Sequence, residues 1–360
     1  MTDVQGATRI DAGRIRSAWE GRVSGCLLGK PLEVLSFQRG PRGVEEYLRV
    51  AGALPLRNYV PMVEGTPVAS IGRDCCLGHI VRAEPDDDIN YTVLALMLLE
   101  QRGIGLETAD VARAWLRLLP AGSTWTAERE AYRTLLTHMA EQFVNGNAAG
   151  FDLAECSDNP FNEWIGAQIR ADLYGWACPG QPSLAAALAR HDASLSHRRE
   201  GVHAAAFVAA LAAAIPASGD VDAAMDRALE EIPGNSLTAA AVRFGRSIAG
   251  SPDAVPRLHQ HYEGLSPVHA INNLALVVWA ICSCGGDFSA AIGDAVSAGW
   301  DTDCNGATVG GLCGLMGMTI PDHWTRPWNG RIAVGLAGHS ELRLDDLVDR
   351  TVVVARRLAS

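Results

Sequence analysis

Residues 300–308 read Trp300-Asp301-Thr302-Asp303-Cys304-Asn305-Gly306-Ala307-Thr308, a short acidic turn that opens directly into an apolar, glycine-rich segment at 309–318. The spacing of Asp301 and Asp303 can aim both carboxylates at one point. A second acidic run, Asp86-Asp87-Asp88, lies far upstream and also leads into an apolar segment, residues 91–100. Mg²⁺ prefers oxygen ligands. The two acidic helix starts therefore predict one shared metal site between helix N-termini.

Each acidic run also has a simpler interpretation as a helix cap. Asp is a favoured N-cap, and the helix dipole stabilises a carboxylate at a helix N-terminus. Three consecutive aspartates fit capping less well, because they repel one another and a cap uses only one or two of them. A bound cation would relieve that repulsion. We therefore favour metal binding over capping.

The composition favours an all-α fold. The chain has 360 residues, of which 48% are hydrophobic and only 6% aromatic, and alanine and leucine are abundant. That mixture favours helices over strands. The formal net charge is −11 and no basic block is present, which excludes sequence-independent nucleic-acid binding and disfavours an anionic membrane surface.

Apolar residues recur at helical spacing along most of the chain, and no composition break marks a linker. We expect one domain over residues 1–360, an orthogonal bundle of about a dozen helices. Residues 36–83 are rich in proline and glycine and are expected to form a long loop that is either a functional excursion or a lid. The predicted helices cover 91–101, 111–119, 127–140, 165–174, 184–189, 202–215, 221–229, 237–248, 268–281, 290–298 and 344–358.

Several features predict a cytoplasmic protein. The N-terminal residues 1–14 are polar, without the apolar core of a signal peptide. No uninterrupted apolar run reaches the ~18 to 20 residues of a membrane span, and residues 204–215 and 274–282 come closest. The nine cysteines show no zinc-ligand spacing, so we expect reduced thiols.

Three motifs carry a resemblance to a known family. They are Gly21-Arg-Val-Ser-Gly25-Cys-Leu-Leu-Gly29-Lys-Pro-Leu-Glu33, then Asp86-Asp87-Asp88, then Gly299-Trp-Asp301-Thr-Asp303-Cys-Asn305-Gly-Ala307. In this order they resemble the glycine-spaced first helix ending in Pro-x-Glu, the Thr-Asp-Asp turn and the late Asp-x-Asp-Thr-Asn-Ala turn of the ADP-ribosylglycohydrolase family. The resemblance spans about residues 15–320.

The resemblance implies an all-α orthogonal bundle that holds two Mg²⁺ ions, or Mn²⁺ in their place. It assigns the catalytic roles to Glu33, Asp87 and Asp303. Departures from the family pattern are Asp86 in place of Thr, Cys304 in place of a Thr hydroxyl ligand, and Cys26 where many members carry Asp. Because Mg²⁺ binds thiols poorly, the presence of Cys304 leaves open whether the site binds one ion or two. The metal ligands implied are Asp86, Asp87, Asp88, Asp301, Asp303 and Cys304.

Two further segments resemble the substrate side of the family. Gly166-Ala167-Gln168-Ile169-Arg170 is similar to a loop that lines the ribose and diphosphate pocket, and Ser196-His197 is similar to a Thr-His pair near the substrate. Arg170 also fits a buried ion pair, and His197 also fits a cap or surface position. The substrate-binding residues implied are Glu163, Gly166, Ala167, Arg170 and His197.

The resemblance implies hydrolysis of the glycosidic bond of an ADP-ribosyl group or of a related ribosyl nucleotide conjugate. Such cleavage passes through an oxocarbenium-like state, and cations would orient ribose hydroxyls and activate water. Two alternatives stay open: a small-molecule N-ribosyl hydrolase acting on a metabolite, and a catalytically silent relative that keeps the fold to bind ADP-ribose or for a structural use. The aglycone, the general base and the oligomeric state are not determined by the sequence.

Overall fold

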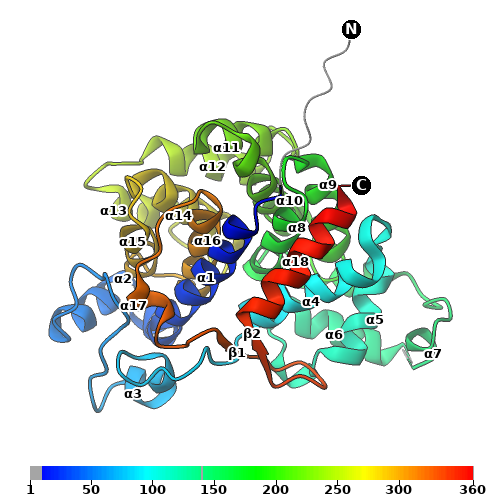
Figure 1. Ribbon diagram of the computed structural model, residues 1–360, viewed down its shortest axis with the longest axis horizontal. Helices are drawn as coiled ribbons and strands as arrows, with labels where there is room; N and C mark the ends of the chain where they lie inside the picture. The colour runs from blue at the N-terminus through cyan, green and yellow to red at the C-terminus, as the bar shows by residue number, and fades with distance from the viewer. Residues whose placement is uncertain (1–9, 139–140, 360) are drawn as a thin grey trace, which may run out of the picture.

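Helix α1 (Ala12–Gly29) and helix α16 (Thr302–Leu315) lie side by side through the middle of the computed structural model, which describes residues 10–138 and 141–359 (Figure 1). Glycines at matching levels of the two helices permit this approach. A Cβ added at Gly25 would lie 1.9 Å from the carbonyl oxygen of Gly306, and one added at Gly21 would lie 2.0 Å from that of Gly310. Only a residue without a side chain fits at such contacts.

The remaining secondary structure is helical apart from one short antiparallel pair, β1 (Arg331–Ala333) with β2 (Glu341–Arg343). The α-helices are α2 (Glu33–Val50), α3 (Pro67–Ile71), α4 (Asp87–Arg102), α5 (Thr108–Leu118), α6 (Thr126–Thr137), α7 (Glu141–Val144), α8 (Asp172–Ala177), α9 (Pro182–Ala193), α10 (Arg199–Ala214), α11 (Val221–Leu229), α12 (Leu237–Ser247), α13 (Ala254–His261), α14 (Ala270–Ser283), α15 (Phe288–Ser297), α17 (Asp322–Thr325) and α18 (Leu344–Leu358). The 3₁₀ turns are η1 (Lys30–Leu32), η2 (Arg73–Cys75), η3 (Gly103–Gly105), η4 (Ala121–Ser123), η5 (Leu153–Ser157), η6 (Ile165–Arg170) and η7 (Ile215–Ala217).

The buried apolar side chains form one large cluster, with α10 among its most enclosed elements. Alanines on most faces of α10 let α8, α9 and α14 pack closely around it. The stretch Arg199–Ala217 is long and apolar enough for a membrane span by length and composition, which the uninterrupted-run criterion did not predict. Because 78% of its apolar window is buried inside the fold, α10 has the environment of a core helix.

The all-α prediction is confirmed, and many helix boundaries agree with the apolar periodicity. The predicted helices 221–229 and 344–358 coincide with α11 and α18. The valine-rich segment within α18 is helical and packs against α1 and α4 (Figure 1). Residues 1–9 of the polar N-terminal segment, and residues 139–140 at the end of the predicted helix 127–140, lie outside the described residues.

Two segments differ from the predictions. The expected loop 36–83 begins with most of α2, whose apolar residues Val44 and Leu48 are fully buried. Gly40, with φ of 62°, interrupts this helix, and Pro41 opens its second half, a position that suits proline. The predicted helix 165–174 is instead η6 followed by α8, with Ala171 between them.

Candidate functional site

The two acidic runs meet at the N-termini of α4 and α16, next to the C-terminal end of α1. Asp86 is the N-cap of α4, and its Oδ1 accepts a hydrogen bond of 3.0 Å from the Asp88 amide. Asp301 is the N-cap residue of α16 but makes no side-chain capping bond. The capping interpretation therefore accounts for Asp86 and does not account for Asp301.

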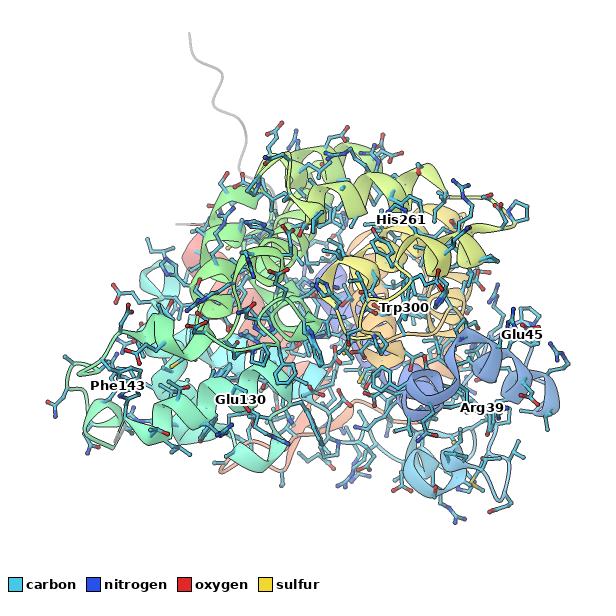
Figure 2. All side chains as sticks on the ribbon, turned by 180° about the vertical axis from the view of Figure 1, so that it is seen from behind. Arg39, Glu45, Glu130, Phe143, His261 and Trp300 are labelled. Carbon is cyan, nitrogen blue, oxygen red and sulfur yellow. The ribbon has the colours of Figure 1, made fainter. Side chains whose placement is uncertain are left out.

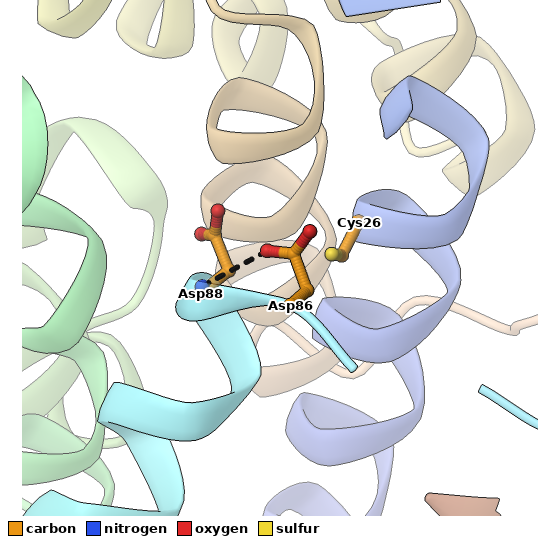
Figure 3. A group of neighbouring side chains, drawn as sticks. All are labelled: Cys26, Asp86 and Asp88. Atoms are coloured by element: carbon orange, nitrogen blue, oxygen red, sulfur yellow. Dashed lines mark hydrogen bonds between the residues drawn. The ribbon is translucent and has the colours of Figure 1, made fainter. Parts of the chain in front are cut away.

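Two groups of potential ligand atoms lie close together in this region. The Sγ atom of Cys26 and carboxylate oxygens of Asp86 and Asp88 all lie within 4.8 Å of one another. Figure 3 shows the Cys26 thiol on α1 facing the Asp86 carboxylate at the start of α4. A second group with the same spacing consists of Asp301, Asp303 and Cys304.

Several carboxylate oxygens here are buried without a hydrogen-bond partner. They are Oδ2 of Asp88, Oδ1 of Asp301 and Oδ1 of Asp303. An unpaired buried polar atom destabilises a protein by about 1 to 3 kcal/mol, and by more when it is charged. Carboxylate oxygens are the ligands that Mg²⁺ and Mn²⁺ prefer. The residues present therefore fit a hard divalent cation.

Burial and mutual repulsion raise the pKa values of several carboxyl groups in this region. Burial, followed by repulsion from Asp86 and Asp303, raises the pKa of Asp87 well above its ordinary value. Burial and the charges of Asp303 and Asp86 likewise raise the pKa of Glu33. Burial and then Asp86 raise the pKa of Asp303 to about 6. A divalent cation would counter this repulsion and favour the ionised carboxylates.

The Cys304 thiol is also shielded from water. Burial, followed by the charges of Asp301 and Asp88, raises its pKa well above the ordinary value. A neutral thiol is a poor ligand for a hard cation. Oxygen atoms of the neighbouring aspartates are thus the better donors in this group.

Lys30 brings a protein cation into the same region. Its Nζ atom lies 2.6 Å from Oδ2 of Asp86 and 2.6 Å from the carbonyl oxygen of Pro85. Burial is the largest single influence on Lys30 and by itself lowers its pKa. The charge of Asp86 and its hydrogen bond to the ammonium are among the effects that together outweigh burial and hold the pKa above its ordinary value. The ammonium group therefore stays charged beside Asp86.

Most of these residues, but not Asp88 or Cys26, line a cleft with a volume of about 770 Å³. Much of the remaining lining is apolar, and its aromatic members are Phe37, Trp125 and Trp164. The side chains of Phe37 and Trp125 are 38% and 57% exposed, so they lie at the mouth. The ionisable lining residues are Glu33, Asp86, Asp87, Glu128, Asp301, Asp303 and Cys304 together with Lys30.

A set of side-chain bonds holds the Asp301 turn in place. The Asn273 Oδ1 atom accepts hydrogen bonds from the Asp301 amide at 3.3 Å and from Nδ2 of Asn305 at 2.7 Å. Its Nδ2 donates to the carbonyl oxygens of Pro267 and His269, both at 2.8 Å. Asn273 thus links the backbone at Pro267 and His269 to the acidic turn and helps to hold that turn in place.

Trp300 anchors the same turn. Its φ of 57° is unusual for a residue with a side chain, and the Ser36 hydroxyl donates to its carbonyl oxygen at 2.8 Å. Its ring packs on His259 with centroids 4.3 Å apart. Figure 2, seen from behind, shows Trp300 near the centre of the fold, whereas Arg39 and Glu45 lie on the outer edge of α2.

The residues predicted to contact substrate are only partly brought to the cleft. Gly166 lines it, but Ala167 and Arg170 lie behind its wall. Arg170 is ion-paired with Glu128 at 2.6 Å and with Asp192 at 2.7 Å, as the alternative of a buried ion pair predicted. Its guanidinium also lies over the Tyr91 ring, 5.3 Å from the centroid.

The other two predicted substrate residues are also engaged elsewhere. His197 is 1% exposed, and its Nδ1 lies 2.8 Å from the Ser196 hydroxyl. Burial lowers the pKa of His197 well below its ordinary value, so the ring is neutral. Glu163 pairs with Arg199 at 2.6 Å and does not line the cleft. His197 and Glu163 therefore lie where they can support the cleft wall rather than contact a substrate.

Several cleft residues did not emerge from sequence reasoning. Phe37, Trp125 and Glu128 carry no local signal, because only the packing of α2 and α6 brings them to the cleft. Lys30 had a signal that was overlooked: it is the only lysine among 30 lysines and arginines, and it stands inside the first glycine-spaced motif.

Comparison with known proteins supports the family suggested by these motifs. The family model described as ADP-ribosylglycohydrolase matches residues 7–357. No curated protein sequence matches the chain significantly. A solved structure titled "ADP-ribosylglycohydrolase-related protein complex" is similar with a TM-score of 0.51 at 18% identity, over 96% of this chain and 99% of that one. At that identity the structural likeness supports the fold alone.

Proposed function

Since the chain belongs to the ADP-ribosylglycohydrolase family, we propose that it is a divalent-cation-dependent hydrolase of an ADP-ribosyl group or a related ribosyl nucleotide conjugate. The bond it cleaves is the glycosidic bond at the anomeric carbon. Mg²⁺ is the proposed cation, with Mn²⁺ as a substitute.

The observation that carries the proposal is the pair of buried, unpartnered carboxylate oxygens on Asp301 and Asp303. Both residues line the cleft that Asp87 and Glu33 also line. Asp301 and Asp303 would hold the cation, and Asp87, which lines the same cleft, is a candidate for a further ligand. When bound, the cation would act as a Lewis acid and lower the pKa of a coordinated water.

The protein's own carboxylates would serve the reaction in two ways. Glycosidic cleavage develops positive charge on the sugar ring, and negative side chains fixed around that ring stabilise it. A carboxylate within reach of the attacking water accepts its proton. Glu33 and Asp87 suit this second role, because both line the cleft near Asp303 and the bound cation would keep them ionised and able to accept a proton.

The apolar part of the cleft lining would orient the substrate. Trp164, Ile165 and Gly166 form a segment that lines the cleft, and Trp164 forms an isolated bridge to His269. The Ile165 amide donates to the Val268 carbonyl at 2.9 Å, which fixes this segment to the other lining residues. A rigid wall holds the anomeric carbon near the carboxylates and lowers the entropic part of the barrier.

Asparagine substitutions at Asp303 and Asp87 test the proposal. Each removes a charge with little change in volume, so the fold should survive while turnover of an ADP-ribosylated substrate falls by at least about 100-fold. Asp222→Asn is the matched control, because Asp222 is also in the first turn of a helix but is exposed and remote from the cleft lining. Unchanged turnover in folded Asp303→Asn protein would contradict the proposal.

A second candidate is a small-molecule N-ribosyl hydrolase, and the charge of the cleft favours it. Among the described lining residues Lys30 is the only Lys or Arg, and Asp86 already pairs with it. Arg170 lies behind the wall with its own carboxylate partners. A diphosphate adds two negative charges to an already acidic cleft, whereas an uncharged ribosyl group adds none.

Substrate comparison separates the candidates. The two rates to compare are the release of free ribose from nucleosides that lack phosphate and the release of ADP-ribose from modified arginine or serine. A faster release of free ribose would favour the small-molecule N-ribosyl hydrolase. The reverse order would favour ADP-ribosyl hydrolysis. Cation binding with no hydrolysis of either substrate class would instead identify a catalytically silent relative.

A further inference from the structure

We infer that the ammonium group of Lys30 serves as a built-in cation on one side of the carboxylate cluster, so that the site takes up a single divalent ion on the other side. This inference rests on the proposed function, since it concerns the same cleft. It concerns the number and position of the ions, which neither the motifs nor the family match determines.

The Asp86 side of the cluster is already bonded within the protein. Oδ1 of Asp86 caps α4, and Oδ2 accepts from Lys30 at 2.6 Å. The Asp86 side chain is 4% exposed and that of Lys30 is 27% exposed, so the pair is largely removed from water. A metal ion at Asp86 would have to displace the ammonium from a short, charge-assisted bond.

The neighbouring Asp88 also has a protein cation. Nη2 of Arg22 lies 3.0 Å from Oδ1 of Asp88, and both side chains are fully buried. Arg22 is held in place by a second ion pair, with Asp172 at 3.0 Å, and by a bond of 2.7 Å to the Thr92 hydroxyl. The two carboxylates of this group therefore face two fixed protein cations.

The third member of this group is a poor ligand. Cys26 offers a sulfur atom within 4.8 Å of carboxylate oxygens of Asp86 and Asp88 (Figure 3). Hard ions such as Mg²⁺ and Mn²⁺ select oxygen donors over thiols. A thiol beside an ammonium thus leaves little for a second divalent ion to bind.

The Asp301 side of the cluster differs in its charge balance. One oxygen each of Asp88, Asp301 and Asp303 is buried without a hydrogen-bond partner. Asp88 is paired with Arg22, whereas among the described residues no Lys, Arg or His lies within ion-pair distance of Asp301 or Asp303. Asp87 also lines the cleft, and there the repulsion from Asp86 and Asp303 exceeds the attraction of Lys30. The carboxylates without a paired protein cation therefore lie on the Asp301 side, which is where we expect the divalent ion to bind.

The choice of lysine at position 30 agrees with this role. The chain contains 29 arginines and one lysine, and that lysine is in the cleft. An ammonium is a compact point charge, whereas a guanidinium is a wide planar fork. The Lys30 ammonium bonds a carboxylate oxygen and a carbonyl oxygen from one nitrogen, each at 2.6 Å, and so brings its whole charge to one point beside Asp86.

Manganese loading tests the inference directly on the wild-type chain. The chelator-treated protein is dialysed against Mn²⁺, and its metal content and electron paramagnetic resonance spectrum are measured. We expect one Mn²⁺ per chain and the six-line spectrum of an isolated ion. Two ions per chain of similar affinity, or the spectrum of a spin-coupled pair, would overturn the inference, and so would the absence of any bound ion.

A double variant provides the complementary test. Cys26→Asp with Lys30→Met replaces a thiol by a carboxylate and removes the ammonium, so the Asp86 side should now bind a second Mn²⁺ and give a coupled spectrum. Arg57→Met is the control, because it removes a cation paired with Asp294 at 2.8 Å outside the cleft, and it should still bind one ion. A folded double variant that binds one ion would contradict the inference.

Turnover is measured separately, so the two proposals fail independently. One bound ion without hydrolysis of any ribosyl substrate would reject the proposed function and retain the inference about Lys30. Two bound ions with hydrolysis would retain the function and reject the inference. If the double variant does not fold, the ion count and spectrum of the wild-type chain still decide.

Discussion

Replacing Gly25 by alanine tests whether the close packing of α1 on α16 positions the two acidic helix starts. A Cβ at Gly25 would lie 1.9 Å from the Gly306 carbonyl oxygen and 3.0 Å from the Ala307 amide nitrogen. These are backbone atoms inside a buried helix, so no side-chain rotation relieves the overlap. The helices must separate by about 1 Å at this level before a methyl group fits.

The cost follows from the geometry. Adding a methyl group to a fully packed contact costs typically about 1 to 3 kcal/mol. We expect the upper value, because Gly21 and Gly29 make equally close contacts one turn away on either side and resist the separation. At an unfolding entropy of about 2.1 cal/mol/K per residue, a loss of about 3 kcal/mol lowers the Tm of a chain of this length by about 4 °C.

The assay is thermal unfolding of wild-type, Gly25→Ala and Gly219→Ala protein. Gly219 is the control, because a Cβ there meets no atom within 4 Å and the backbone does not adopt a positive φ. Mn²⁺ affinity is measured on the same samples and should fall by at least about 10-fold for Gly25→Ala, since its separation moves Asp303 relative to Asp87. If Gly25→Ala and Gly219→Ala unfold at the same temperature, the packing argument is wrong.

Three further changes have expected outcomes. Arg22→Met leaves the buried Asp88 and Asp172 carboxylates without their cation and should lower the free energy of unfolding by about 3 to 5 kcal/mol in urea titrations. Asp303→Asn should raise the Tm of the cation-free protein by relieving repulsion and abolish the rise in Tm that Mn²⁺ produces, as thermal scans with and without Mn²⁺ would reveal. Burial outweighs Arg22 and raises the pKa of Asp172 to about 6 in the folded chain, so its stabilising contribution is present below about pH 4 and lost as the pH rises through 6. Urea midpoints between pH 4 and 8 should therefore fall for wild-type protein relative to Asp172→Asn, and parallel curves would contradict this assignment.

Local patterns accounted for most of the helices. The apolar spacing of residues 221–229 and 344–358 predicted the bounds of α11 and α18 to the residue. A helix that buries one face has apolar residues every three to four positions, and this period is visible in the sequence. The same reasoning failed for α2, where Gly40 and Pro41 were interpreted as loop signals. A kink that keeps both halves of a helix packed has the same local sequence as a break.

The acidic runs show where local information ends. The sequence predicted that Asp86–Asp88 and Asp301–Asp303 begin helices and meet, and they do lie at the N-termini of α4 and α16. It did not separate capping from ligand positions, because that depends on which oxygen atoms find partners. Only the folded chain shows Asp86 bonded as a cap and Asp301 with an unpaired buried oxygen.

The sequence by itself therefore determined the helical class, the family motifs and the residues that carry negative charge to the cleft. The tertiary structure alone decided how those charges are compensated. It placed Arg170 behind the wall between Glu128 and Asp192, and it placed Lys30 beside Asp86. The physical reason is that charge compensation depends on distances of a few ångströms between side chains far apart in sequence, which no local pattern encodes.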